Sequence, residues 1–216
     1  TLHSFLATFH RPTTKALCAK GELEMGFSIS WIAVKDRKLN QVIEYLGIDS
    51  TNEVEEFPES DISGADLPNG WCHIQFSDFD SPFIQEAALQ KISDSTQVIF
   101  CQIEEHVMYS KSCCWENGRF SWSSEHDAQQ DLRHIISNGE IPDDFEKIKK
   151  DHLDMQDQED SDVDCIFEVP LALASLITSI KHDELPEEEI EYQVLKTSTD
   201  CEFKSKPWWK RIWKSA

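Results

Sequence analysis

The chain has 216 residues, 41 of them acidic and 20 basic, which gives a formal net charge of −21. This charge repels nucleic acids and anionic lipid headgroups, so we do not expect the acidic body of the protein to bind either. Because 39% of the residues are hydrophobic and seven are tryptophan, the chain can bury one sizeable core and is not expected to be disordered throughout.

The beginning of the chain lacks the patterns of regular structure. Residues 1–24 show neither a helical nor a strand period, and Met25 is the first methionine. We therefore expect residues 1–24 to be a disordered or non-native extension before a natural start at Met25. The length then predicts a single domain over residues 25–203, followed by a basic, tryptophan-rich tail over residues 204–216.

Strands and helices are predicted to alternate over the first half of this domain. The expected elements are a strand at 27–34, a helix at 39–46, a strand at 70–76, a helix at 82–92 and a strand at 97–103. Gly47 and Pro82 supply a helix stop and a helix start. Residues 49–69 are rich in acids and contain two prolines, which predicts a loop with a short strand at 54–57.

The second half begins with a strong hairpin signal. Asn117-Gly118 lies between two aromatic runs, and this dipeptide is typical of a two-residue β-turn. Helices are expected at 145–152 and 169–180, with a late strand at 192–195. The order of elements predicts an α+β fold with one antiparallel-rich sheet and helices packed on one face. Its first five elements suit a ferredoxin-like unit that the hairpin extends.

One group of side chains suggests a metal-dependent enzyme. Alternation places Glu104 and His106 on one face of a strand, and the hairpin would bring His126 and Asp127 close to them. Two imidazoles and two carboxylates suit a divalent metal that activates water. No standard zinc-protease template is present, so the alternative is a solvated sheet end paired with lysine and arginine.

An acidic segment follows the predicted helix at 145–152. Residues 151–164 contain seven acids and no lysine or arginine. Asp157, Glu159 and Ser161 fall at positions one, three and five of a calcium-binding loop that would end at Glu168. The sixth position, which should be glycine, is Asp162, so a solvated acidic loop is the alternative.

The seven cysteines form no recognisable framework, because their number is odd and no CxxC motif occurs. This use of cysteine predicts a reducing cytoplasm. Cys113 and Cys114 lie beside the hairpin turn, and one of them would be reactive if it were exposed near His106 or His126. A strand places the two thiols on opposite faces, so at least one is expected in the core.

The tail combines aromatic and cationic residues. As a helix it would place Trp208, Trp209 and Trp213 on one side, and Lys210 and Arg211 largely on the other. This composition suits a membrane interface or a hydrophobic groove of a partner. The alternatives are a disordered tail, or tryptophans that fold back onto the domain while the cations pair with its acids.

The residues Met-Gly-Phe-Ser-Ile-Ser-Trp-Ile-Ala-Val at 25–34 resemble the opening of a family of uncharacterised bacterial cytosolic proteins. Similar stretches are found at 55–60, 101–107 and 124–128, so the resemblance spans residues 25 to about 195. It implies no activity. In size, acidity and α+β pattern the chain is also similar to immunity proteins of bacterial toxin systems.

The first functional hypothesis is therefore a non-catalytic, immunity-like cytosolic protein that needs no cofactor and offers an acidic surface to a basic protein partner. The residues expected to contact this partner are Trp71, Trp115, Asp157, Glu159, Asp160 and Asp162. The second hypothesis is the metal-dependent enzyme that uses Glu104, His106, His126 and Asp127. The third is a membrane-peripheral protein that acts through its tail.

Overall fold

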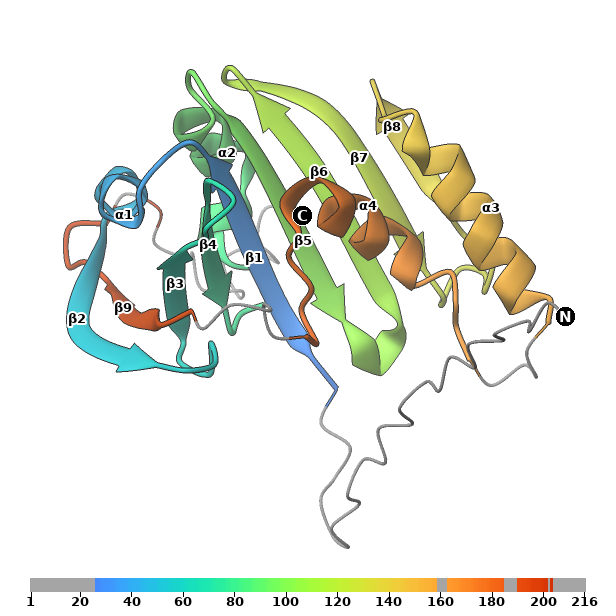
Figure 1. The fold of residues 1–216 in the computed structure, drawn as a ribbon, viewed down its shortest axis with the longest axis horizontal. Helices are drawn as coiled ribbons and strands as arrows, with labels where there is room; N and C mark the ends of the chain where they lie inside the picture. Colours follow the sequence, from blue (N-terminus) through green and yellow to red (C-terminus); the bar gives the residue numbers. More distant parts are fainter. Residues whose placement is uncertain (1–25, 159–162, 185–189, 202, 204–216) are drawn as a thin grey trace, which may run out of the picture.

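The computed structural model describes residues 26–158, 163–184, 190–201 and 203, and these form one nine-stranded sheet with helices on both sides (Figure 1). The strands are β1 (Ser28–Lys35), β2 (Ile48–Glu55), β3 (Ile62–Asp66), β4 (Trp71–Phe76), β5 (Gln97–Glu104), β6 (Tyr109–Glu116), β7 (Arg119–Asp127), β8 (Ile136–Gly139) and β9 (Tyr192–Thr197). The helices are α1 (Leu39–Leu46), α2 (Glu86–Ile92), α3 (Asp144–Gln156) and α4 (Glu168–Thr178), with short 3₁₀ turns η1 (Pro82–Ile84) and η2 (Glu105–Val107).

The sheet has the strand order β2-β9-β3-β4-β1-β5-β6-β7-β8, and all neighbours are antiparallel. The α+β class with one antiparallel sheet is therefore confirmed. The elements β1-α1-β3-β4-α2-β5 have the spatial strand order of a ferredoxin-like unit, with β2 inserted between α1 and β3. The predicted hairpin extends this unit through β6 and β7, and both Asn117 and Gly118 have the positive φ that its turn requires.

Helices cover both faces of the sheet, which corrects the prediction that they pack on one face. Trp31 and Ile99 pack into a core that includes Leu173 of α4 and Phe145 of α3. Their sequence neighbours point the opposite way, into a second core with α1 and α2. The central strand β1 is buried at six consecutive positions, so both of its faces need a cover.

The segment predicted as a loop at 49–69 forms most of β2 and all of β3. These strands are short of apolar residues, and both pair with β9, about 130 residues or more later in the chain, although β3 also pairs with the nearby β4. Local pattern could not reveal such a partner, because β-strand formation depends on pairing with distant segments. Figure 1 shows β2 at one end of the sheet and β8 at the other, with α4 in front of β5 and β6.

Candidate functional site

A pocket of about 900 Å³ lies over β4 and β9, on the face of the sheet that carries α4. Helix α4 packs over β5, β6 and β7, and no helix of the described residues covers the strands toward β2 on this face. His73 and Gln75 of β4 and Tyr192 of β9 line the pocket. The other lining residues come from the end of α4 and the segment after it, from 57–59, from 67–69 and from Phe27.

Hydrogen bonds from polar side chains hold these walls in place. The Gln75 side-chain amide donates to the carbonyl of Pro58 over 2.9 Å, which ties the 57–59 wall to β4. Asn69 donates to the carbonyl of Thr178 over 2.8 Å, and this bond satisfies one of the free carbonyls at the end of α4. His182 Nε2 lies 3.1 Å from Glu105 Oε1 and fixes the segment beyond α4.

His73 is the chemically distinctive residue of the pocket. Its Nδ1 lies 3.0 Å from the hydroxyl of Tyr192, whereas its buried Nε2 has no hydrogen-bond partner among the described residues. Burial lowers the pKa of His73 to about 3 and raises the pKa of Tyr192 to about 12, so both are neutral at pH 7. A neutral imidazole offers one donor and one acceptor, so the hydrogen-bonding capacity of the buried Nε2 is unused within the described residues.

A row of carboxylates lies along one end of the sheet, and we call it the acidic edge; one of its members, Glu59, also lines the pocket. It consists of Asp49, Glu53, Glu56, Glu59 and Asp61 from β2 and the loop after it. All five are exposed, and none forms an ion pair with another described residue. Residues 39–90 contain eleven acids and no lysine or arginine, so any nearby cation comes from another segment, such as Lys196 of β9 opposite Asp49.

Two apolar side chains stand among these carboxylates. Val54 is 60% exposed and Phe57 is 41% exposed. Phe57 and Glu59 also line the pocket, so the acidic edge and the pocket form one continuous surface. The sequence offers no signal for this arrangement, since its parts come from β2, β4, α4 and β9.

The four residues of the predicted metal cluster divide between separate partners. His106 Nδ1 lies 2.7 Å from Glu104 Oε1, so these two residues do lie together. Asp127 instead accepts hydrogen bonds from the backbone of Gln129 and the side chain of Gln130. Within the described residues, no three histidines, cysteines or acids are grouped in a way that could hold a metal ion.

His126, the fourth member of that cluster, has a structural environment. It is fully buried, with Nε2 2.9 Å from Asp164 Oδ2 and Nδ1 2.6 Å from the carbonyl of His134. Asp164 also accepts from the backbone N–H groups of Ile166 and Phe167 just before α4. Both nitrogens of His126 are therefore occupied, which leaves none for acid–base chemistry.

The aromatic residues expected to contact a partner need correction. Trp71 lies in the core on the α4 side and Trp115 in the core on the opposite side, so both are buried. Each sits on an inward-facing strand position, and sequence alternation did not distinguish a covered face from a free one.

Several predicted contact residues fall in or beside segments outside the described part of the chain. Asp157 pairs with Arg133 on the surface. Glu159, Asp160, Asp162, the extension at residues 1–24 and the tail tryptophans Trp208, Trp209 and Trp213 lie outside the described residues. The calcium-loop reading therefore stays a prediction.

The thiols beside the hairpin are not poised for reaction. Burial raises the pKa of Cys113 to about 12 and that of Cys114 to about 11, so both are protonated at neutral pH. The prediction of a reactive thiol is therefore not supported. All six cysteines in the described part of the chain are buried, and no disulfide joins two of them.

No protein-family model, curated protein or solved structure matches this chain. The resemblance stated for residues 25 to about 195 thus remains a prediction. None of the helices in the described ranges combines the length and the apolarity that a membrane crossing requires.

Proposed function

We propose that this protein is a non-catalytic cytosolic binding protein, of an immunity-like kind, whose acidic edge receives a basic protein partner. The observation that carries the proposal is the row of five exposed carboxylates without ion-pair partners among the described residues. Unpaired charges of one sign accelerate encounter with a partner of opposite charge and disfavour partners of like charge.

The apolar side chains that lie among the carboxylates of the acidic edge supply binding free energy that exposed charges alone do not. Val54 and Phe57 take the role that the sequence had suggested for Trp71 and Trp115. Interface affinity usually comes from a few such anchors that lose contact with water, with surrounding charges that set specificity.

The backbone of β2 is poorly suited to pairing with a strand of the partner. Its register shifts between Ser50 and Val54, and Asn52 has a φ of 65°. Bulges of this kind twist an edge strand and protect it from edge-to-edge association. We therefore infer that side chains, and not backbone hydrogen bonds, make the contact.

The cytosolic location is part of the same proposal. It is supported by the buried cysteines of the described residues, no two of which form a disulfide, because oxidising compartments favour disulfides.

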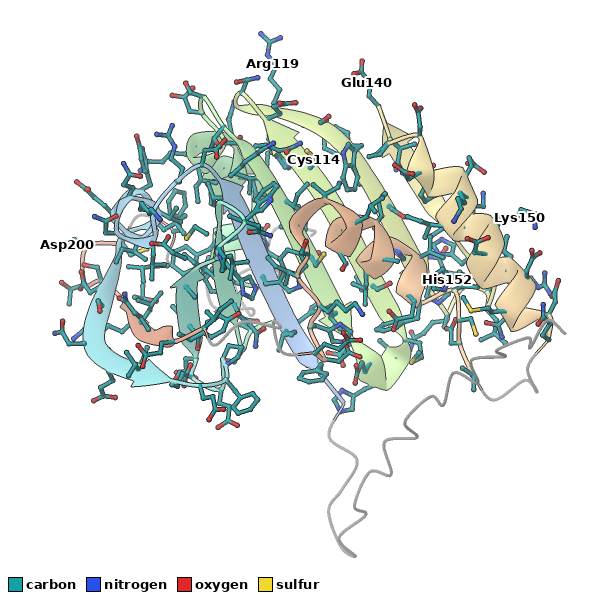
Figure 2. All side chains as sticks on the ribbon, viewed as in Figure 1. Cys114, Arg119, Glu140, Lys150, His152 and Asp200 are labelled. Atoms are coloured by element: carbon teal, nitrogen blue, oxygen red, sulfur yellow. The ribbon has the colours of Figure 1, made fainter. Side chains whose placement is uncertain are left out.

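The test is affinity capture from a cell lysate with the full chain as bait, followed by binding of the purified captured protein. The bait is compared with the triple variant Glu53→Gln, Glu56→Gln, Glu59→Gln. A matched control carries Glu116→Gln, Glu140→Gln and Glu146→Gln, which make the same charge change at exposed positions toward the other end of the sheet. Figure 2 shows Glu140 extending from the molecule at the β8 end.

The expected partner is basic, and its affinity falls steeply with added salt. We expect the acidic-edge variant to bind it at least about tenfold more weakly, since each lost charge pair in an interface contributes a fraction of 1 kcal/mol or more. The control should bind as the wild type does. A partner that binds all three baits equally, or independently of salt, would overturn the proposal.

A further inference from the structure

We infer that the pocket beside the acidic edge binds a tryptophan or tyrosine side chain of the basic partner, flanked in the partner by lysine or arginine. This inference rests on the proposed function and adds the chemistry of the anchor. Glu59 of the acidic edge and the neighbouring Phe57 line the pocket, so a partner that fills the pocket also lies beside that end of the acidic edge.

The walls of the pocket are suited to an aromatic ring. Its apolar lining is made of Phe27, Phe57, Pro58, Leu67, Pro68, Leu176, Ile180 and Ile190. Leu176 is 57% exposed, although it belongs to an otherwise well-packed helix. A volume of about 900 Å³ is within the range of ligand-binding sites and holds one large aromatic side chain with its neighbours.

His73 explains why the ring should carry a polar atom. It lies beside two aromatic rings, with centroid distances of 5.6 Å to Trp31 and 5.7 Å to Tyr192. Its Nε2 is the buried polar atom in the pocket lining that lacks a partner among the described residues. When Nδ1 donates to the Tyr192 hydroxyl, Nε2 is left as an acceptor for an indole N–H or a phenol O–H, which a phenylalanine or leucine anchor cannot supply. Because Nε2 is covered in the free protein, this bond requires the side chains over it to move aside when the anchor enters.

The rim of the pocket explains the flanking cations. Glu59, Asp183 and Glu184 line it together with one lysine, Lys181, whose ammonium lies 2.7 Å from Glu184. His182 is directed to Glu105 at 3.1 Å. Carboxylates therefore outnumber the ammonium groups, and a peptide with positive residues on either side of its aromatic anchor complements this rim.

The test uses isothermal titration of the full chain with three blocked peptides. They are Lys-Arg-Trp-Arg-Lys, the same peptide with alanine in place of tryptophan, and Glu-Gln-Trp-Gln-Glu. We expect the first to bind at least about tenfold more tightly than the second, and the third not to bind, because both the ring and the cations are required.

Two substitutions locate the binding. Leu176→Arg fills the pocket mouth and adds a like charge, so it should reduce the affinity for the tryptophan peptide to that of the alanine peptide. Leu132→Arg, at a leucine of similar exposure (51%) between β7 and β8, is the control and should change nothing. His73→Phe should lower the affinity for the tryptophan peptide about 2–10-fold, since it removes one hydrogen bond. The affinity for the alanine peptide should not change.

Failure of this inference differs from failure of the proposed function. The pocket inference alone would be overturned if the tryptophan and alanine peptides bound the wild type equally and neither bound the acidic-edge variant. Binding of the tryptophan peptide that survives Leu176→Arg would do the same. Tighter peptide binding after Trp208→Ala, Trp209→Ala and Trp213→Ala would assign the pocket to the chain's own tail, and would also overturn it.

Discussion

At the residue scale, His73 is a buried polar side chain that affects stability and lines the proposed binding pocket. The fold keeps it neutral by removing it from water, and Tyr192 satisfies only one of its two nitrogens. A buried nitrogen without a partner costs free energy. A ligand that forms a hydrogen bond with this nitrogen would offset the cost, and this supports the proposed binding role of the pocket.

The low pKa of His73 makes stability depend on pH. The unfolded chain takes up a proton below about pH 6.5, whereas in the fold the pKa of His73 is about 3. Its stabilising contribution is therefore present above pH 6.5 and is lost as the pH falls toward 3. When the pH is lowered from 7 to 5, His73 should therefore decrease the free energy of unfolding by about 2 kcal/mol, at about 1.4 kcal/mol per pH unit below 6.5.

Urea unfolding at pH 7 and pH 5 checks this prediction. The decline should be smaller in His73→Phe than in the wild type by about that amount. His106→Ala, at an exposed histidine, should keep the wild-type decline. Equal declines in His73→Phe and the wild type would show that His73 is not the group that titrates.

At the element scale, α4 is attached to the sheet at its beginning and at its end, and it forms one wall of the pocket. Just before the helix, Asp164 accepts hydrogen bonds from the backbone N–H groups of Ile166 and Phe167, and it also contacts His126 of β7. His126 in turn contacts the carbonyl of His134 through Nδ1, so both of its nitrogens have hydrogen-bond partners. At the end of α4, the side chain of Asn69 donates a hydrogen bond to the carbonyl of Thr178.

We expect Asp164→Ala to lower the free energy of unfolding by about 3–5 kcal/mol, because it removes the carboxylate that bonds to buried His126 and to two backbone N–H groups before α4. Asp200→Ala should change it by less than about 0.5 kcal/mol, since Asp200 is exposed at the opposite end of the molecule (Figure 2). Urea unfolding measures both. A small effect of Asp164→Ala, similar to that of Asp200→Ala, would mean that the bonds to His126 and α4 contribute little.

At the scale of the whole molecule, the charge of −21 opposes compactness. Repulsion among exposed carboxylates is screened by salt, with a Debye length that falls from about 30 Å at 0.01 M to about 8 Å at 0.15 M ionic strength. The melting temperature should therefore rise when NaCl or KCl is increased over this range. The same rise with both salts would identify screening, whereas a fall would indicate that net attraction between charges holds the fold together.

Much of the fold could be predicted from local signals. The Asn117-Gly118 turn and the helical spacing of Leu39, Val42 and Leu46 led to the correct elements, because turn chemistry and periodicity act over a few residues. Strand β2 was largely missed, since its polar residues form a strand only against β9. The candidate site was missed for the same reason.

The sequence by itself determined the class of fold and the excess of acid, including the uninterrupted acidic character of residues 39–90. Only the tertiary structure decided which faces were covered. It buried Trp71 and Trp115, paired His126 with Asp164, and brought His73 beside Tyr192 from 119 residues away. The physical reason is that alternation assigns a side chain to one of two faces, while the chain's distant segments determine which part of a face stays open.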